Sequence, residues 1–224
     1  GSFNDICYAV TVDPVSGAVY AAGMFRGNGS GAGAAMLRTF DASGALLWSR
    51  SWTGTGPSDA AARGVAVDPW GDVVVVGSVD FTGNADWFVR KYDAAGSLLW
   101  SRTYNTGGTW WAQAHSVAVD RNGFIYAAGF MTGDWRIAKF DAAGNLILET
   151  TYNGPGGGGW ETVEGITVDS GGNIVAAGIV DAGWPLPLDD WGVRKYDSGG
   201  NLLAAESHTS ADPHIVGGFG GSED

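Results

Sequence analysis

Four side chains that could contact a ligand recur at one position of a repeated pattern: Tyr8, Arg63, His115 and Glu164. They are spaced 55, 52 and 49 residues apart, and each directly precedes a short segment of small and apolar residues. A phenol, a guanidinium, an imidazole and a carboxylate differ in charge and in hydrogen-bonding capacity. A purely structural position would keep one residue type, so this variation is what a ring of ligand-binding side chains around the mouth of a central channel would show. A solvated rim without a ligand is the alternative.

Bulky aromatic and acidic residues gather in the long irregular segments between the apolar runs. The residues of these segments that we predict to bind a ligand are Trp110, Trp111, Trp160, Glu161 and Trp184. Indole faces stack on sugar rings, and neighbouring charged groups can bond to hydroxyls. The alternative is that these indoles cover the end of the core. Trp110 and Trp111 are the strongest pair, because adjacent side chains in an extended segment cannot both face one core.

Motifs of the common catalytic and metal sites are absent from the sequence. It contains no HExxH, no Walker loop and no GxSxG. The three histidines do not stand at metal-ligand spacing. We therefore expect no catalytic residue, no metal and no cofactor. An enzyme stays open as an alternative, namely a glycoside hydrolase or lyase with Glu161, Glu164 or Asp189 as acid and base. Such an enzyme needs two carboxylates about 5–10 Å apart, one of them with a raised pKa.

The elements that position these residues are short strands in a repeat of about 50 residues. The segment after each variable residue reads AVTVD, GVAVD, SVAVD or GITVD, starting at residues 9, 64, 116 and 165. Each unit contains four apolar runs, which predicts four strands per unit in a propeller or a solenoid. The predicted units span about residues 5–53, 61–105, 114–153 and 163–209 of a single domain, 1–224.

The turn sequences predict that each unit is an antiparallel meander. Asp41, Asp93, Asp141 and Asp197 each precede a glycine by three residues. Aspartate can accept hydrogen bonds from the turn backbone and glycine tolerates a positive φ, so a type I turn with a bulge is expected. The first strand of each unit is rich in small residues, which suits the innermost strand of a propeller. Residue types shared between units, such as the Asp-Trp pairs and the basic strand residues, are expected to be structural.

The second unit reads GVAVD, then GDVVVVG, then DWFVRKYDAAGSLLWS. This pattern resembles the bacterial SBBP-type β-propeller repeat and is similar, more distantly, to the NHL repeat. The resemblance implies a propeller whose blades have their first strand innermost, in a secreted or cell-surface domain used for binding or scaffolding. Two features depart from the pattern. Such families usually form rings of six or more blades, whereas this sequence contains four units. In the first unit, Ala34-Ala35 stands where the second unit has Asp86-Trp87.

The charge of the chain limits its partners. A net charge of −12 disfavours nucleic acids and anionic membranes, because an acidic surface repels phosphate groups. The single cysteine, Cys7, permits no disulfide within the chain. We predict an all-β propeller with four blades that binds a carbohydrate or a protein partner on its Trp-rich loop face. A structural array element without a small ligand is a third class.

The two ends of the chain fall at equivalent points of the repeat, because the C-terminal GGSED resembles the linker before each inner strand. Two arrangements satisfy this relation. A four-bladed ring could close within one chain as a monomer, which we expect, or two chains could complete an eight-bladed ring as a homodimer. In both cases we expect no open blade face, since exposed strand surfaces favour aggregation.

Overall fold

Four antiparallel sheets of four strands each make up the structure. This computed structural model describes residues 5–26, 32–56, 58–80, 85–104, 111–154, 161–181 and 189–208. Consecutive strands are neighbours in every sheet, which confirms the predicted meanders. Within the described ranges, no helix has the length and apolarity needed to cross a membrane.

Each sheet is one blade, numbered in chain order. Blade 1 consists of β1 (Ile6–Val12), β2 (Val19–Phe25), β3 (Ala34–Phe40) and β4 (Leu46–Trp52). Blade 2 consists of β5 (Ala61–Val67), β6 (Val73–Asp80), β7 (Ala85–Tyr92) and β8 (Leu98–Tyr104). Blade 3 consists of β9 (Ala112–Val119), β10 (Ile125–Met131), β11 (Asp134–Phe140) and β12 (Leu146–Tyr152). Blade 4 consists of β13 (Thr162–Val168), β14 (Ile174–Asp181), β15 (Asp189–Tyr196) and β16 (Leu202–His208).

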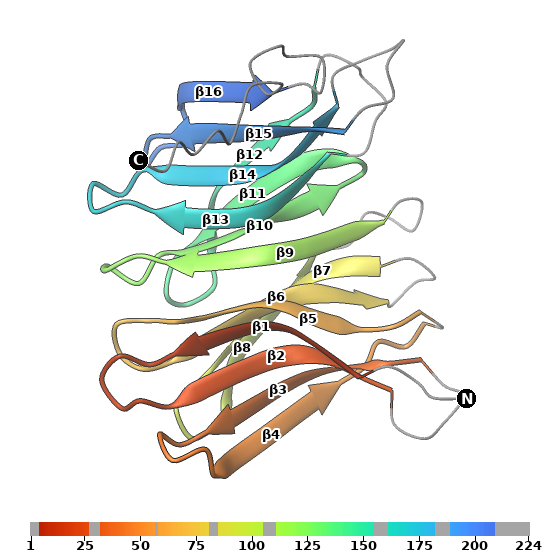
Figure 1. Cartoon of the computed structure of the whole chain (residues 1–224), viewed down its shortest axis with the longest axis vertical. Coiled ribbons are helices and arrows are strands. Elements are labelled where there is room, and N and C mark those ends of the chain that lie inside the picture. The colour runs from red at the N-terminus through yellow and green to blue at the C-terminus, as the bar shows by residue number, and fades with distance from the viewer. Residues whose placement is uncertain are drawn as a thin grey trace, which may run out of the picture.

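The blades stack face to face in chain order (Figure 1). The first strands β1, β5, β9 and β13 contact one another in succession, and the fourth strand of each sheet lies farthest from this row. The predicted inner position of the first strand is therefore confirmed. This arrangement is that of propeller blades, so the chain is an all-β, propeller-type protein with four blades.

Glycines with a positive φ close the turns between the third and fourth strands, as predicted. Their φ angles are +88°, +82°, +78° and +83° at Gly44, Gly96, Gly144 and Gly200. In blade 2 the Gly96 amide donates to the Asp93 carbonyl at 2.9 Å, and the Ser97 amide donates to the Asp93 carboxylate at 2.7 Å. The hydrogen bond from the Ser97 amide is the main reason that the pKa of Asp93 is lowered.

The core consists of side chains buried between successive blades. Trp87 is fully buried between blades 2 and 3, and its Nε1 donates to the Phe130 carbonyl at 2.8 Å. Trp135 donates in the same way to the Ile179 carbonyl of blade 4. The structural role expected for the Asp-Trp pairs is therefore confirmed for both of these indoles.

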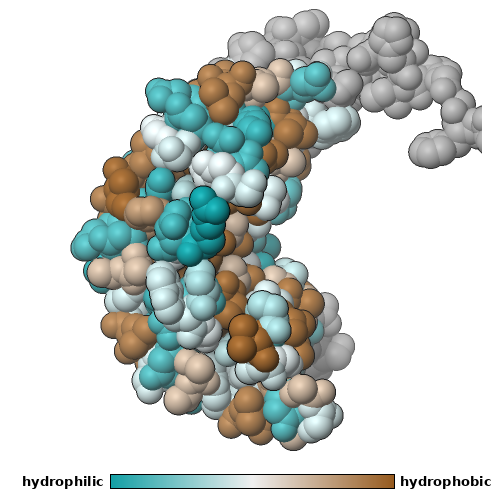
Figure 2. Space-filling model, turned by 90° about the vertical axis from the view of Figure 1, so that its left-hand side faces the viewer, coloured by the Kyte–Doolittle hydropathy of each residue, from teal (hydrophilic) through white to brown (hydrophobic). Residues whose placement is uncertain are grey.

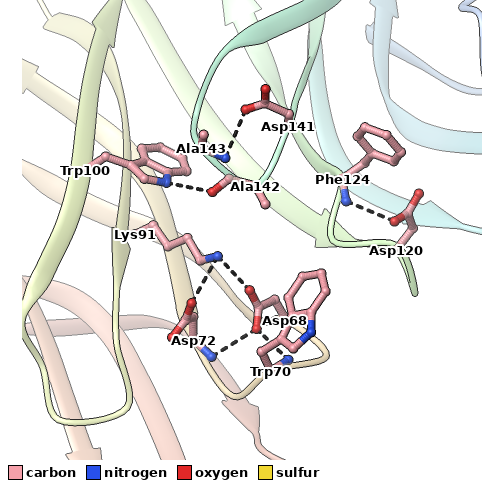
Figure 3. A network of polar contacts seen from close by, with 10 residues as sticks. All are labelled: Asp68, Trp70, Asp72, Lys91, Trp100, Asp120, Phe124, Asp141, Ala142 and Ala143. Atoms are coloured by element: carbon pink, nitrogen blue, oxygen red, sulfur yellow. Dashed lines mark hydrogen bonds and ion pairs between the residues drawn. The ribbon is translucent and has the colours of Figure 1, made fainter.

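Repeated polar residues connect strands to turns (Figure 3). The Lys91 Nζ lies 2.8 Å from the Asp68 carboxylate and 3.1 Å from that of Asp72, so the lysine joins the third strand of its blade to the first turn. The Trp100 Nε1 donates to the Ala142 carbonyl at 3.0 Å, which joins the outer strand of blade 2 to a turn of blade 3. These contacts explain why the basic and aromatic residues recur.

The four blades form an open arc (Figure 2). At one end, Val10 and Val12 of β1 remain 65% and 53% exposed, and at the other end Trp191 of β15 remains 52% exposed. The expected four-bladed ring within one chain, without an open blade face, is therefore wrong. Bulky side chains such as Trp52 and Trp87 fill the space between successive blades, and four blades joined in this way leave both end faces of the arc exposed to solvent.

Candidate ligand-binding groove

A β-bulge in each inner strand holds one of the four variable residues. In β1, Tyr8 is the extra residue where the register to β2 shifts. The same shift leaves Arg63 as the extra residue in β5, His115 in β9 and Glu164 in β13. An extra residue in a bulge is released from the alternation of its strand, so its side chain is re-aimed. We call these four residues the bulge quartet.

A glycine on the second strand of each blade makes the bulge possible. These glycines are Gly23, Gly77, Gly129 and Gly178, at which an added Cβ would lie 2.1, 1.9, 2.0 and 2.0 Å from a carbonyl oxygen of the inner strand. No real Cβ approaches an oxygen so closely, so a side chain is excluded at each position. The recurrence of this glycine is a sequence signal for the bulge that the period of the repeat does not reveal.

The bulge quartet lines one hollow along the inner strands. All four side chains border a cavity of about 320 Å³, whose floor includes the small residue Ser116. The Arg63 guanidinium lies 4.8 Å from the centroid of the Tyr8 ring. Such cation–π contact holds both side chains in place while the rest of the guanidinium can still donate hydrogen bonds. The structure thus brings the predicted ring together, and its binding role stays a prediction.

His115 and Glu164 form a polar pair within the groove. The His115 Nδ1 lies 3.1 Å from the Glu164 Oε1, and its Nε2 lies 3.3 Å from the Gln113 Oε1. The pKa of Glu164 is lowered, first because its carboxylate accepts the hydrogen bond from His115, and further by Thr162 and the charge of Arg63, although burial opposes the shift. The carboxylate therefore stays ionised at neutral pH and can accept hydrogen bonds from a ligand.

A second hollow continues the groove towards the long connections at the end of the blades. It has a volume of about 540 Å³ and shares Tyr8 and Arg63 with the first hollow. Trp111 lines it and is 50% exposed, so this indole does not belong to the core. Asp59 also lines it, and the sequence pattern does not indicate this residue. The reason is that its position in the repeat, four residues before the bulge residue, holds Trp111 and Trp160 in other units.

The other predicted binding residues have different outcomes. Trp110, Trp160 and Trp184 lie outside the described residues. Glu161 is only 2% exposed, and its carboxylate accepts a hydrogen bond from the Gly154 amide. It therefore braces a connection inside the protein and does not line the groove, contrary to the sequence-based expectation.

The surroundings of the described carboxylates in the two hollows favour their ionised form. These carboxylates are Asp59 and Glu164, and the pKa of each is lowered. Burial alone would raise the pKa of Asp59, but hydrogen bonds from the Gly33 amide and Arg26 lower it. A general acid needs a raised pKa to carry its proton at neutral pH. Across the described part of the chain, no three His, Cys, Asp or Glu side chains gather as a metal site would require.

Comparisons with known proteins concern the fold. No protein-family model matches the chain, and no curated protein matches it in sequence. The structure is similar to a protein of unknown function from Bacteroides caccae, with a TM-score of 0.52 and 10% identity, over 92% of this chain and 83% of that one. It is also similar to a glycosyl hydrolase from Bacteroides ovatus, with a TM-score of 0.48 and 12% identity, over 90% of this chain and 70% of that one. An α-L-arabinofuranosidase from Clostridium thermocellum matches with a TM-score of 0.49 and 11% identity, over 91% and 71% of the two chains. At 10% identity, the similarity to the Bacteroides caccae protein shows a shared fold and nothing about function.

Proposed function

We propose that this chain is a non-catalytic binding domain that holds a carbohydrate in the groove formed by the bulge quartet and Trp111. The observation that carries the proposal is the placement of four different polar side chains beside one exposed indole. Sugars present both apolar ring faces and hydroxyl groups. An exposed indole suits the ring faces, and Arg63, His115 and Glu164 can donate to or accept from the hydroxyls.

The side chains of the site are held in place before a ligand binds, which supports a role in binding. The quartet belongs to strands and not to loops, and the His115–Glu164 and Arg63–Tyr8 contacts hold its side chains in place before a ligand arrives. Pre-organisation reduces the entropy lost on binding. The resemblance of the repeat to the SBBP type, whose members mostly bind or scaffold, supports the same class of function.

Glycan-array screening followed by isothermal titration calorimetry tests the proposal. Trp111→Ala is expected to weaken binding of the best array glycan at least about tenfold, which corresponds to about 1.4 kcal/mol. Trp70→Ala is the matched control, because Trp70 is 64% exposed and lies in a tight turn outside the groove. The control is expected to bind like the wild-type protein. Absence of any glycan ligand, or equal loss in both variants, contradicts the proposal.

The same sample separates binding from hydrolysis. The lowered pKa values of Asp59 and Glu164 predict that the bound glycan stays intact on prolonged incubation, as checked by mass spectrometry. Cleavage that Glu164→Gln abolishes would instead establish the glycoside hydrolase alternative.

A further inference from the structure

The joints between blades share a set of equivalent positions on the second and third strands. We call the sheet face that packs on the next blade the forward face, and the opposite one the rear face. At the joint of blades 2 and 3, the forward face carries Val74, Val76, Trp87 and Val89, and the rear face carries Ile125, Ala127, Ala138 and Phe140. All eight of these side chains are buried. The joint is therefore an apolar contact of two complete sheet faces.

The forward face of blade 4 has the composition of a joint but lies at the end of the arc. By register it carries Val175, Ala177, Trp191 and Val193. Trp191 occupies the position of Trp87, which is fully buried, yet Trp191 is 52% exposed. A half-exposed indole within an apolar sheet face is typical of an interaction surface.

The rear face of blade 1 lies at the other end of the arc and contains a hollow. By register it carries Val19, Ala21, Met36 and Phe40, which are partly exposed here. The equivalents of Val19, Ala21 and Phe40 in blades 2 and 3 are buried. Ala21, Met36 and Phe40 line a cavity of about 280 Å³. The hollow lies on the face that receives the preceding blade at every internal joint.

The hydrogen bond that marks two internal joints can form between these two faces. Trp87 and Trp135 each donate their Nε1 to a carbonyl on the second strand of the next blade, at Phe130 and Ile179. In blade 1 the same register position belongs to Met24, which borders the hollow. If Trp191 packed against blade 1 of another molecule, its indole would therefore lie beside the Met24 carbonyl, which corresponds to the carbonyls that accept from Trp87 and Trp135.

The two end faces carry one pair of opposite charges at positions that meet in an internal joint. At the joint of blades 1 and 2, Arg50 lies on the forward face and Arg90 on the rear face, where Arg90 stacks 4.6 Å from the Trp52 ring. The equivalent positions at the ends of the arc hold Glu206 in blade 4 and Arg38 in blade 1. A contact of the end faces thus places opposite charges where the internal joint has two like charges.

We propose that the forward face of blade 4 binds the rear face of blade 1 of a second copy of this chain, so that two copies close one ring of eight blades. Two equal joints related by a two-fold axis leave neither end face exposed. The ring also places Glu164 of each copy next to Tyr8 of the other, and joins the two bulge quartets into one row. The proposal does not depend on the identity of any ligand.

Charge reversal tests the proposal directly. Size-exclusion chromatography with light scattering is expected to give twice the 23.1 kDa mass of one chain for the wild-type protein. Arg38→Glu and Glu206→Arg are each expected to raise the dissociation constant at least about tenfold, a loss of about 1.4 kcal/mol. The double variant is expected to recover the dimer, because the opposite charges are restored. Arg121→Glu, in an exposed turn away from both faces, serves as the control and is expected to stay dimeric.

Circular dichroism of each variant verifies that its blades remain folded, which is expected because Arg38 and Glu206 are exposed. A wild-type protein that has the mass of one chain at every concentration overturns the proposal. So does a dimer that both single variants leave intact, since another surface would then hold it. A species larger than two chains contradicts closure into a two-copy ring.

Discussion

Replacement of Gly96 by alanine tests how much of the folding free energy comes from the turn itself and how much from the contact between two blades. Gly96 has a φ of +82°, which an alanine adopts at a cost of about 1–2 kcal/mol. The added Cβ would also lie 2.7 Å from the Trp48 ring of the preceding blade, so the indole must move. Trp48 donates its Nε1 to the Ala94 carbonyl at 3.0 Å, and Arg50 donates to the Gly96 carbonyl at 2.8 Å. Loss of one such hydrogen bond costs about 0.5–1.5 kcal/mol.

Gly44 provides the matched control for this substitution. Its φ is +88°, and nothing lies within 4 Å of an added Cβ. Gly44→Ala therefore reports the backbone cost alone, whereas Gly96→Ala adds the disturbance of the joint. Gly96→Ala is expected to lower the free energy of unfolding by about 1 kcal/mol more than Gly44→Ala does.

Urea unfolding followed by tryptophan fluorescence and circular dichroism measures both variants against the wild-type protein. Equal losses in the two variants would refute the claim that the turn around Gly96 stabilises the outer strand of the preceding blade through Trp48 and Arg50. No loss in Gly44→Ala would refute the positive φ of the turn itself.

Two further predictions concern the bulges and the acid stability. Gly129→Ala is expected to destabilise the protein by at least about 2 kcal/mol, because its Cβ would lie 2.0 Å from a carbonyl oxygen of the bulge. Gly165→Ala, where nothing lies within 4 Å, is the control in the same urea titration, and equal stability of the two variants contradicts the bulge geometry. The pKa of Asp141 is lowered, chiefly by a hydrogen bond from the Asn145 side chain, so its stabilisation is complete above the ordinary aspartate pKa of about 3.9 and is lost as the pH falls through the lowered value. Urea midpoints measured from pH 7 down to about 2 are expected to fall less steeply in Asp141→Asn, and an unchanged slope would contradict this role.

The blade is predictable from sequence because its signals are local. Asp93 and Gly96 specify a turn through a side-chain acceptor and a positive φ, and both contributions act within four residues. The convergence of Tyr8 and Glu164 on one groove follows from the repeat, since equivalent positions of stacked blades must form a row. The period of the repeat does not predict the bulge that orients these side chains. Its sequence signal is the glycine at Gly129 and at the equivalent positions, where a side chain would clash with the inner strand.

Closure and the loop residues depend on distant contacts that the repeat does not encode. The side chain that fills a joint differs from one joint to the next, since Trp52 comes from the fourth strand of its blade whereas Trp87 comes from the third. The burial of the candidate binding residues likewise depends on contacts that the repeat does not encode. Trp111 and Glu161 lie at neighbouring positions of equivalent segments, yet one is half exposed and the other is buried. From residue type alone, the glutamate would be expected at the surface and the tryptophan in the core. The opposite is observed, and the buried Glu161 carboxylate accepts a hydrogen bond from the Gly154 amide.

A nuclear magnetic resonance titration with the best array glycan tests most directly whether the bulge quartet and Trp111 bind a ligand. The indole N–H of Trp111, the Arg63 Nε–H and the His115 ring protons are expected to shift in a saturable way, because these groups line one continuous groove. The indole of Trp70, in a turn outside the groove, is expected to stay unchanged and serves as the internal reference. Saturable shifts at Trp70 and its turn, with the Arg63 and His115 signals unmoved, would contradict the assignment of the groove.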